Sequence, residues 1–224
     1  MSESHKITFP NESKEYRSKR LELLEVEAEL RQKLEEVASL RRELLPGGEI
    51  KEDYIFDELK DGRVEQVRMS DLFETGKNSL FVYGFMFGPD AKNPCPMCTV
   101  LLDSLNGSAS YFQQRANLVV VARAPIEKVQ SFADSRGWNN LRMLSSQGNS
   151  FNPDYQSEAE NGAQMPMANV FTKTNGKVHH FWAPEVFYVP IESDPRHMDL
   201  IFPLWNLLDF TPEGRGSDWM PKVF

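Results

Sequence analysis

"SLFVYGFMFGPDAKNPCPMCTVLLDSL", residues 79–105, contains both cysteines of the chain and indicates the fold around them. Residues 79–87 form a continuous apolar run rich in aromatic side chains, which is typical of a strand buried on both faces. The loop that follows ends at Cys95, and the pattern of residues 99–115 predicts a helix that can break at Gly107. The stretch therefore predicts a strand, a loop and a helix, with the cysteines where the helix begins.

The two cysteines, Cys95 and Cys98, have the spacing of a dithiol that opens and closes a disulfide. The N–H groups and the dipole at the start of a helix stabilise a thiolate, so we expect the pKa of Cys95 to fall. Cys98 lies one turn further on, close enough to attack a mixed disulfide on Cys95 and release its partner. Pro96 shapes the turn and has no N–H to donate. The pattern favours thiol–disulfide exchange.

Two other interpretations of the cysteine pair stay open. A zinc site needs two more ligands, and none of the four histidines shows a paired ligand spacing: His5, His179, His180 and His197. Adjacent histidines on a strand point to opposite faces of the sheet, which weakens this interpretation. In the second interpretation, the cysteines are two buried thiols that pack as small residues of the core. We favour the dithiol and expect neither a metal nor a cofactor.

The composition is that of an ordinary soluble globular protein, with 40% hydrophobic and 26% charged residues. The 33 acidic and 25 basic residues give a formal charge of −8, and a nucleic-acid partner is not expected because its surface needs clustered positive charge. The first 16 residues lack the apolar region of a signal peptide, and no apolar run is long enough to span a membrane. We expect a cytoplasmic protein without a membrane partner, where a structural disulfide is disfavoured.

An apolar stripe runs along residues 13–45 at steps of three and four, made by Leu23, Val26, Leu30, Leu34, Val37, Leu40 and Leu44. It predicts an amphipathic helix with partial heptad character that ends at Pro46. At 1.5 Å per residue the helix is about 50 Å long, more than one small domain usually covers. Packing within the chain and pairing with a second copy both fit the stripe. Its length and regularity lead us to expect a homodimer through residues 13–46.

Strands and helices alternate along the rest of the chain. Short extended runs flank a turn at Asp61-Gly62, Ser70 is expected to cap a short helix, and a hairpin turn stands at Asn175-Gly176. We also expect strands at 117–124 and 141–146, helices at 125–138 and 195–210, and a long surface loop at 147–164. This order indicates an α/β domain with a mixed central sheet. The expected parts are a disordered tail at 1–12, a helical extension at 13–46 and one domain at 47–224.

A second short motif, Met165-Pro166-Met167, stands directly before an expected strand at residues 168–172. A proline at the start of a strand that faces a dithiol is a plausible site for a cis peptide bond, so we expect Met165–Pro166 to be cis. The cis bond would turn the backbone of Met165 outward, where its N–H and C=O pair with an incoming peptide. Met165 and Met167 would add adaptable apolar contacts to a protein substrate.

These motifs carry a resemblance to the thioredoxin-like superfamily. "PCPMC" (94–98) and "MPMANVFTKTNGKV" (165–178) resemble its active-site loop and its cis-proline with the last hairpin, and residues 56–88 resemble the leading hairpin and first core strand of its peroxiredoxin-like and cytochrome-maturation branches. "KEDYIF" (51–56), "YGFMFGPD" (83–90) and "NLLDFTPEGR" (206–215) resemble the uncharacterised bacterial family of predicted dithiol-disulfide oxidoreductases. The resemblance covers residues 15–216 and implies a thioredoxin-like three-layer α/β fold with a mixed central sheet, preceded by the long amphipathic helix.

The resemblance also implies roles for individual residues. Cys95 would be the nucleophile, Cys98 the resolving thiol and Pro166 the proline that positions the substrate. Their neighbours would contact the substrate, which adds Pro96, Met97, Met165 and Met167 to the site. The implied activity is that of a thiol–disulfide oxidoreductase acting on a disulfide-containing protein or a small thiol substrate. The alternative is a non-catalytic thioredoxin-like module that binds proteins and dimerises through its N-terminal helix.

The chain departs from related families at three places. Thioredoxins keep a buried acid in the strand before the dithiol, where this chain has Tyr83 or Gly84, so Asp90 becomes a candidate proton donor to Cys98. Peroxiredoxins place a threonine three residues before their cysteine, where Lys92 stands here, and peroxide reduction is therefore disfavoured. No glycine pair follows the proline strand to indicate a glutathione site.

Overall fold

The computed structural model describes residues 7–190, 196, 198–216 and 219–223. The chain divides into two compact units, Met1–Leu45 and Pro46–Phe224. Within the described residues, no helix combines the length and the apolar character that a membrane crossing requires.

The first unit is built on the helix α1, Lys14–Arg42, which confirms the predicted N-terminal helix. Ser13 caps it, because its hydroxyl oxygen accepts a 3.1 Å hydrogen bond from the Tyr16 N–H. Before the helix, a turn closes with a hydrogen bond from the Glu12 N–H to the Phe9 carbonyl. Residues 1–6, half of the expected tail, lie outside the described residues.

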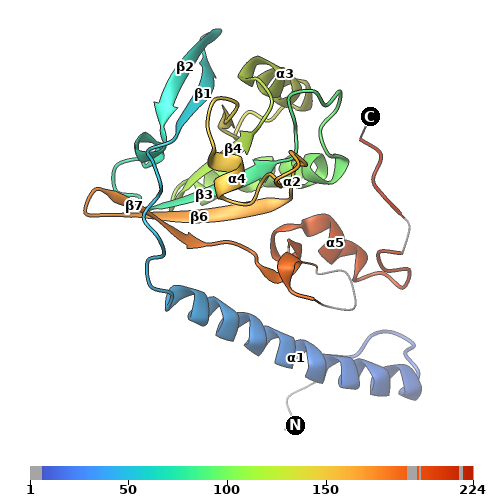
Figure 1. The fold of residues 1–224 in the computed structure, drawn as a ribbon. Coiled ribbons are helices and arrows are strands. Elements are labelled where there is room, and N and C mark those ends of the chain that lie inside the picture. The colour runs from blue at the N-terminus through green and yellow to red at the C-terminus, as the bar shows by residue number, and fades with distance from the viewer. Residues whose placement is uncertain (1–6, 191–195, 197, 217–218, 224) are drawn as a thin grey trace. The chain divides into compact units, whose positions relative to one another are not determined.

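The second unit contains one mixed seven-stranded sheet in the order β2-β1-β5-β4-β3-β6-β7 (Figure 1). The strands are β1 Ile55–Lys60, β2 Arg63–Arg68, β3 Ser79–Phe85, β4 Asn117–Ala122, β5 Met143–Ser145, β6 Met167–Thr174 and β7 Lys177–Trp182. The helices are α2 Pro96–Phe112, α3 Ile126–Arg136, α4 Phe151–Asp154 and α5 Pro203–Leu208, with short 3-10 helices at Met69–Leu72, Val186–Tyr188 and Asp199–Ile201. The central strand β3 pairs in parallel with β4 and antiparallel with β6, and helix α2 connects β3 to β4. This is a thioredoxin-like arrangement, so the predicted fold is confirmed.

The core lies on both faces of the sheet, because alternate residues of the central strands point to opposite sides. In β3, Tyr83 and Phe85 join the core beneath α2 and α3, whereas Leu80 and Val82 join a second core that includes Phe151 of α4. All of these side chains are almost fully buried. Helices on both faces of the sheet give the expected three layers.

Local details of the second unit differ from the sequence-based expectations. Ser70 does not cap a helix: its hydroxyl donates a 2.7 Å hydrogen bond to Asp53, and the short 3-10 helix already begins at Met69. Helix α2 begins at Pro96, earlier than expected, and continues without a break through Gly107 to Phe112.

Two longer segments also differ from the expectation. The expected surface loop at 147–164 contains the short helix α4, whose Phe151 is fully buried. The expected C-terminal helix is divided into a 3-10 turn at Asp199–Ile201 and α5 from Pro203, because proline has no N–H to continue a helix. Residues 195 and 197 of that expected helix lie outside the described residues.

Candidate active site

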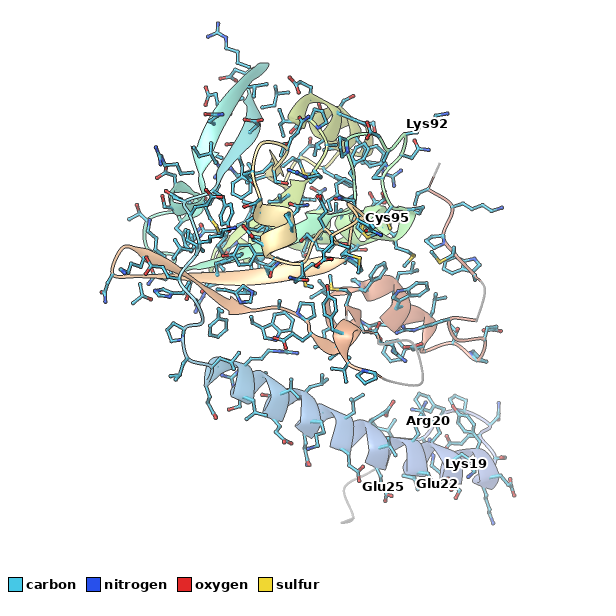
Figure 2. The ribbon with its side chains drawn as sticks, in the orientation of Figure 1. Lys19, Arg20, Glu22, Glu25, Lys92 and Cys95 are labelled. Carbon is cyan, nitrogen blue, oxygen red and sulfur yellow. The ribbon has the colours of Figure 1, made fainter. Side chains whose placement is uncertain are left out.

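Cys95 stands where the loop after β3 meets helix α2 (Figure 2). It is the N-cap residue of α2, and Pro96 occupies the first turn, where its missing N–H costs no hydrogen bond. The Cys95 N–H donates a 3.0 Å hydrogen bond to the Met86 carbonyl, which ties the cysteine back to the end of β3. The sequence therefore folds so that the first cysteine sits at the positive end of a 17-residue helix.

Lys128 of α3 fastens the loop that leads to the dithiol. Its ammonium donates hydrogen bonds of 2.9 Å to the Pro89 carbonyl and 2.5 Å to the Ala91 carbonyl. The same ammonium lies 4.9 Å from the centre of the Phe87 ring, a cation–π contact. The loop thus reaches Cys95 in a defined conformation.

The environments of the two thiols differ, as predicted. Cys95 is half-buried and Cys98 is buried, and both are free thiols. A hydrogen bond from the Cys98 thiol, helped by the backbone N–H groups of Cys98 and Met97, lowers the pKa of Cys95 to about 6 against the opposing effect of burial. That same hydrogen bond, then burial and the nearby Cys95 charge, raises the pKa of Cys98 well above its ordinary value. The geometry therefore gives one thiolate at neutral pH, on the more accessible sulfur.

Tyr83 of β3 lies directly beneath the second thiol. Its hydroxyl forms a hydrogen bond with the side chain of Cys98 and lowers the pKa of that thiol, in opposition to burial. The tyrosine is 2% exposed, and burial raises its own pKa well above the usual range, so the hydroxyl stays protonated. Asp90, the candidate donor from sequence, is exposed and does not line the cavity at the dithiol.

A cavity of about 270 Å³ opens at the two sulfur atoms, and we call it the dithiol cavity. Residues of the sheet, of α2 and of the loop before β6 form one wall: Tyr83, Met86, Met97, Leu101 and Pro166. The other wall comes from the C-terminal part of the chain: Arg196, Met198, Asp199, Phe202, Trp205, Arg215 and Met220. The sequence did not identify this second wall as part of the site, although residues 206–215 were among the most specific parts of the resemblance.

The prediction of a cis Met165–Pro166 bond is wrong, because every peptide bond between described residues is trans. The trans bond fits the local hydrogen bonding: the Met165 N–H donates a 2.9 Å hydrogen bond to the Ser157 carbonyl, within the loop that leads to β6. The Met165 N–H is therefore already paired and is not presented to an incoming peptide. Pro166 nevertheless lines the dithiol cavity with Cys95 and Cys98.

The other residues expected at the substrate are distributed differently. Met97 lines the dithiol cavity, whereas Pro96 and Met165 are half-buried beside it without lining it. Met167 is buried and lines a different cavity, together with Tyr155 and His180. Lys92 is exposed on the loop before Cys95 (Figure 2). The structure thus brings Cys95, Met97, Cys98 and Pro166 together and leaves Met167 apart.

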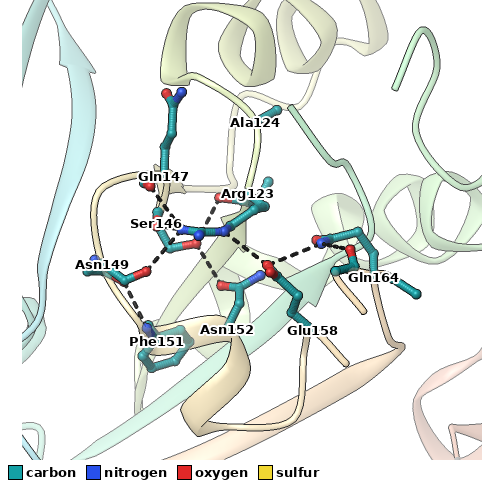
Figure 3. A network of polar contacts seen from close by, with 12 residues as sticks. Arg123, Ala124, Ser146, Gln147, Asn149, Phe151, Asn152, Glu158 and Gln164 are labelled. Carbon is teal, nitrogen blue, oxygen red and sulfur yellow. Dashed lines mark hydrogen bonds and ion pairs between the residues drawn. The ribbon is translucent and has the colours of Figure 1, made fainter. Parts of the chain in front are cut away.

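A polar network holds the loop that carries Pro166 (Figure 3). One guanidinium nitrogen of Arg123, just after β4, donates to the carbonyls of Ser146, Gln147 and Asn149 at 2.5, 2.9 and 2.9 Å. A second nitrogen of Arg123 forms a 2.9 Å ion pair with Glu158, which also accepts a 3.3 Å hydrogen bond from Gln164. Arg123 therefore positions the segment before Pro166 without lining the dithiol cavity itself.

The comparison with protein families gives one match. Residues 4–223 match the family described as "Bacterial protein of unknown function (DUF899)". Because the match spans nearly the whole chain, the chain belongs to this family. A search of the curated proteins found no match.

Several solved structures are similar to this chain. Peroxidoxin BcpB from Mycobacterium tuberculosis is 18% identical, with a TM-score of 0.47, over 71% of this chain and 95% of that one. AhpC from Enterococcus faecalis is 13% identical, with a TM-score of 0.46, over 80% and 99% of the two chains. The mitochondrial 2-Cys peroxiredoxin from Plasmodium falciparum is 13% identical, with a TM-score of 0.46, over 74% and 95%.

Proposed function

We propose that this chain, as a member of the DUF899 family, is a thiol–disulfide oxidoreductase that works through Cys95 and Cys98. The observation that carries the proposal is the contrast between the two thiols: Cys95 at the start of α2 has a pKa lowered to about 6, and its neighbour Cys98 is buried and protonated. Such a pair suits a nucleophile and a resolving thiol. A reducing compartment, which we propose to be the cytoplasm, would keep both as thiols.

The reaction begins when the Cys95 thiolate attacks one sulfur of a substrate disulfide. The substrate S–S bond breaks, a mixed disulfide forms on Cys95, and the first substrate thiol leaves with a proton from water. Cys98 then loses its proton and attacks the Cys95 sulfur, which releases the second substrate thiol and leaves a Cys95–Cys98 disulfide. The substrate gains two electrons from the protein. Two equivalents of a small thiol, or one dithiol, return the protein to its reduced form.

Trapping of the mixed disulfide tests the assignment of roles. In the Cys98→Ser variant, Cys95 can attack a disulfide but nothing resolves the adduct, so a covalent adduct should accumulate when a small disulfide is added. The Cys95→Ser variant should form no adduct, because its remaining thiol is buried and has a raised pKa. Intact-mass spectrometry distinguishes the two results. Equal trapping by both variants would remove the assignment.

The exposed face of α1 supports a second proposal, a homodimer formed through residues 13–46. The side chains of its apolar stripe are between 39% and 60% exposed, from Val37 to Val26. Ion pairs lie elsewhere along the helix, including the pair of Lys19 with Glu22 at 2.6 Å (Figure 2). When a second helix covers a stripe of leucine and valine at heptad-like spacing, burial of these apolar side chains stabilises the dimer.

The same helix is the basis of the alternative function, a non-catalytic thioredoxin-like module that binds protein partners. A count of free thiols before and after mild oxidation discriminates between the two functions. The oxidoreductase should lose both thiols together and regain both on reduction. The binding module should keep at least one thiol free throughout.

A further inference from the structure

The wall that the C-terminal part of the chain adds to the dithiol cavity restricts what reaches Cys95. Phe202 is 4% exposed and belongs to the same core as Cys98, and α5 contacts α2. Trp205 stacks on Phe202 with ring centres 5.6 Å apart, and Arg215 lies 5.4 Å from the centre of the Trp205 ring. This wall is therefore packed against the helix that carries the dithiol, and it forms one side of the cavity at Cys95.

Four charged side chains hold this wall together, and we call Arg196 with residues 198–215 the C-terminal clamp. Arg215 pairs with Asp199 at 2.7 Å and with Asp209 at 2.9 Å, and Arg196 pairs with the same two carboxylates, at 2.5 Å for Asp209. Two guanidinium groups thus face two carboxylates, so the charges of the network balance. The network holds the clamp together, and it presents no net charge to a substrate in the cavity.

The remaining lining of the dithiol cavity is apolar and adaptable. Four methionines line it, Met86, Met97, Met198 and Met220, and they share it with the aromatic rings of Tyr83, Phe202 and Trp205. Methionine side chains adjust to substrates of different shapes. Transfer of a charged group into such surroundings costs free energy unless a partner neutralises it. At about 270 Å³ the cavity lies just below the roughly 300–1,000 Å³ of ordinary small-molecule pockets.

The backbone beside the cavity gives an independent observation against a peptide substrate. The Met165 N–H, which would extend an incoming strand, is bonded to the Ser157 carbonyl at 2.9 Å. Strand addition gains its affinity from unpaired main-chain groups, and this donor is already used.

We infer that the substrates of the dithiol are small, uncharged organic disulfides, and that the C-terminal clamp excludes folded proteins. The inference rests on the proposed function and names its substrate class. The chemistry is the exchange described above, in which the small disulfide takes two electrons and leaves as two thiols. The enzyme disulfide is then reduced by a thiol.

The test measures how fast the reduced full-length protein loses its two thiols to three disulfides, by acid quench, alkylation and mass spectrometry. The disulfides are neutral 2-hydroxyethyl disulfide, anionic oxidised glutathione and the protein insulin. Each rate is divided by the rate of the same disulfide with dithiothreitol, which removes differences in intrinsic reactivity. The normalised rate with the neutral disulfide should be about tenfold or more above the rates with the other two, which is within the range of discrimination between substrates that a shaped pocket achieves.

Opening the clamp should change this selectivity. Arg215→Gln and the isosteric Asp209→Asn each remove two ion pairs of the clamp. Each variant should raise the normalised rate with insulin about fivefold, the equivalent of roughly 1 kcal/mol in total. The matched control is Arg136→Gln, which removes an ion pair with Asp103 on the surface between α2 and α3 and should leave the rates unchanged. Retained circular dichroism shows that the variants fold.

Two results would overturn the inference, and they are distinguishable. Equal normalised rates for insulin and 2-hydroxyethyl disulfide, or no gain with insulin in either clamp variant, would remove the substrate class and leave the oxidoreductase standing. No loss of thiols to any of the three disulfides would remove the oxidoreductase as well.

Discussion

The hydroxyl-bearing side chain of Tyr83 and the thiol of Cys98 lie in the same buried core and line the same cavity, where the hydroxyl lowers the pKa of the thiol. The tyrosine comes from the central strand β3 and the cysteine from the first turn of α2, so the contact joins the two elements that form the site. Because the tyrosine hydroxyl donates to the sulfur, it favours the thiolate of Cys98 at the moment that this residue must attack. A neutral buried hydroxyl thus assists the second thiol of the pair.

Replacement of this hydroxyl should slow only the second step of exchange. In Tyr83→Phe the pKa of Cys98 should rise further, and release of a mixed disulfide from Cys95 should slow about fivefold, as expected for a hydrogen bond worth about 1 kcal/mol. Alkylation of Cys95 should keep its rate, since Tyr83 is not among the groups that lower the pKa of Cys95. Single-turnover kinetics with a small disulfide measure both steps. The control Tyr111→Phe, at an exposed residue of α2, should leave the rates of both steps unchanged. A slower first step in Tyr83→Phe would contradict a role of Tyr83 in the second step alone.

Alkylation as a function of pH tests the acidity of Cys95. In the folded reduced protein, the rate with iodoacetamide should rise with pH and reach half of its maximum at about pH 6, because only the thiolate reacts. Cys98 should react much more slowly at neutral pH, since its pKa is raised and its side chain is buried. In urea both cysteines should react alike, with a midpoint near the ordinary cysteine pKa of about 8.5. The same midpoint in the folded protein would contradict the activated thiol.

Two glycines, Gly84 in β3 and Gly107 in α2, give a matched pair of stability tests. A Cβ at Gly84 would lie 2.7 Å from the Ser157 hydroxyl and 3.1 Å from the Met167 carbonyl, so Gly84→Ala should lower the free energy of unfolding by about 1–3 kcal/mol. A Cβ at Gly107 meets nothing within 4 Å, and in the interior of α2 Gly107→Ala should raise that free energy by about 0.5–1 kcal/mol. Urea unfolding measures both. The same sign for the two variants would contradict the described packing.

Light scattering tests the homodimer. The full chain at tens of micromolar should have twice the mass of one chain, and a chain that begins at Glu49 should be monomeric. Within the full chain, Leu30→Lys should weaken the dimer, because a charge would enter the apolar stripe, whereas Glu25→Lys on the polar side should not. A monomeric mass for the full chain would favour packing of the helix within its own chain.

The sequence predicts best where local patterns decide the structure. The apolar run at 79–87 and the glycine turns each determine their own backbone, and the structure has the corresponding strand and hairpins. The expected cis bond at Met165–Pro166 was wrong, because tertiary context and not the place of a proline before a strand decides which isomer an ordered loop adopts. No local pattern shows the hydrogen bond from the Met165 N–H to the Ser157 carbonyl, eight residues away, either.

The second wall of the dithiol cavity could not be predicted from local sequence patterns either, because its residues are far from the cysteines in the chain. Met198, Trp205 and Arg215 come from a segment that reads as an ordinary amphipathic helix and a loop, and only tertiary packing brings them to the cysteines. The sequence does contain one signal, the balanced set of two arginines and two aspartates at Arg196, Asp199, Asp209 and Arg215. The spacing of these four residues suits neither a single helix face nor a strand, so the ion-pair network that they form can be seen only in the folded structure.

The most direct test of the central claim is the equilibrium of the full-length protein in glutathione redox buffers of graded composition at pH 7, read by alkylation and intact mass. The account predicts that Cys95 and Cys98 lose their thiols together in one reversible two-electron transition, whereas Cys98→Ser accumulates a glutathione adduct on Cys95. Two free thiols across the whole range of buffers, or a wild-type protein that ends as a glutathione adduct, would contradict it.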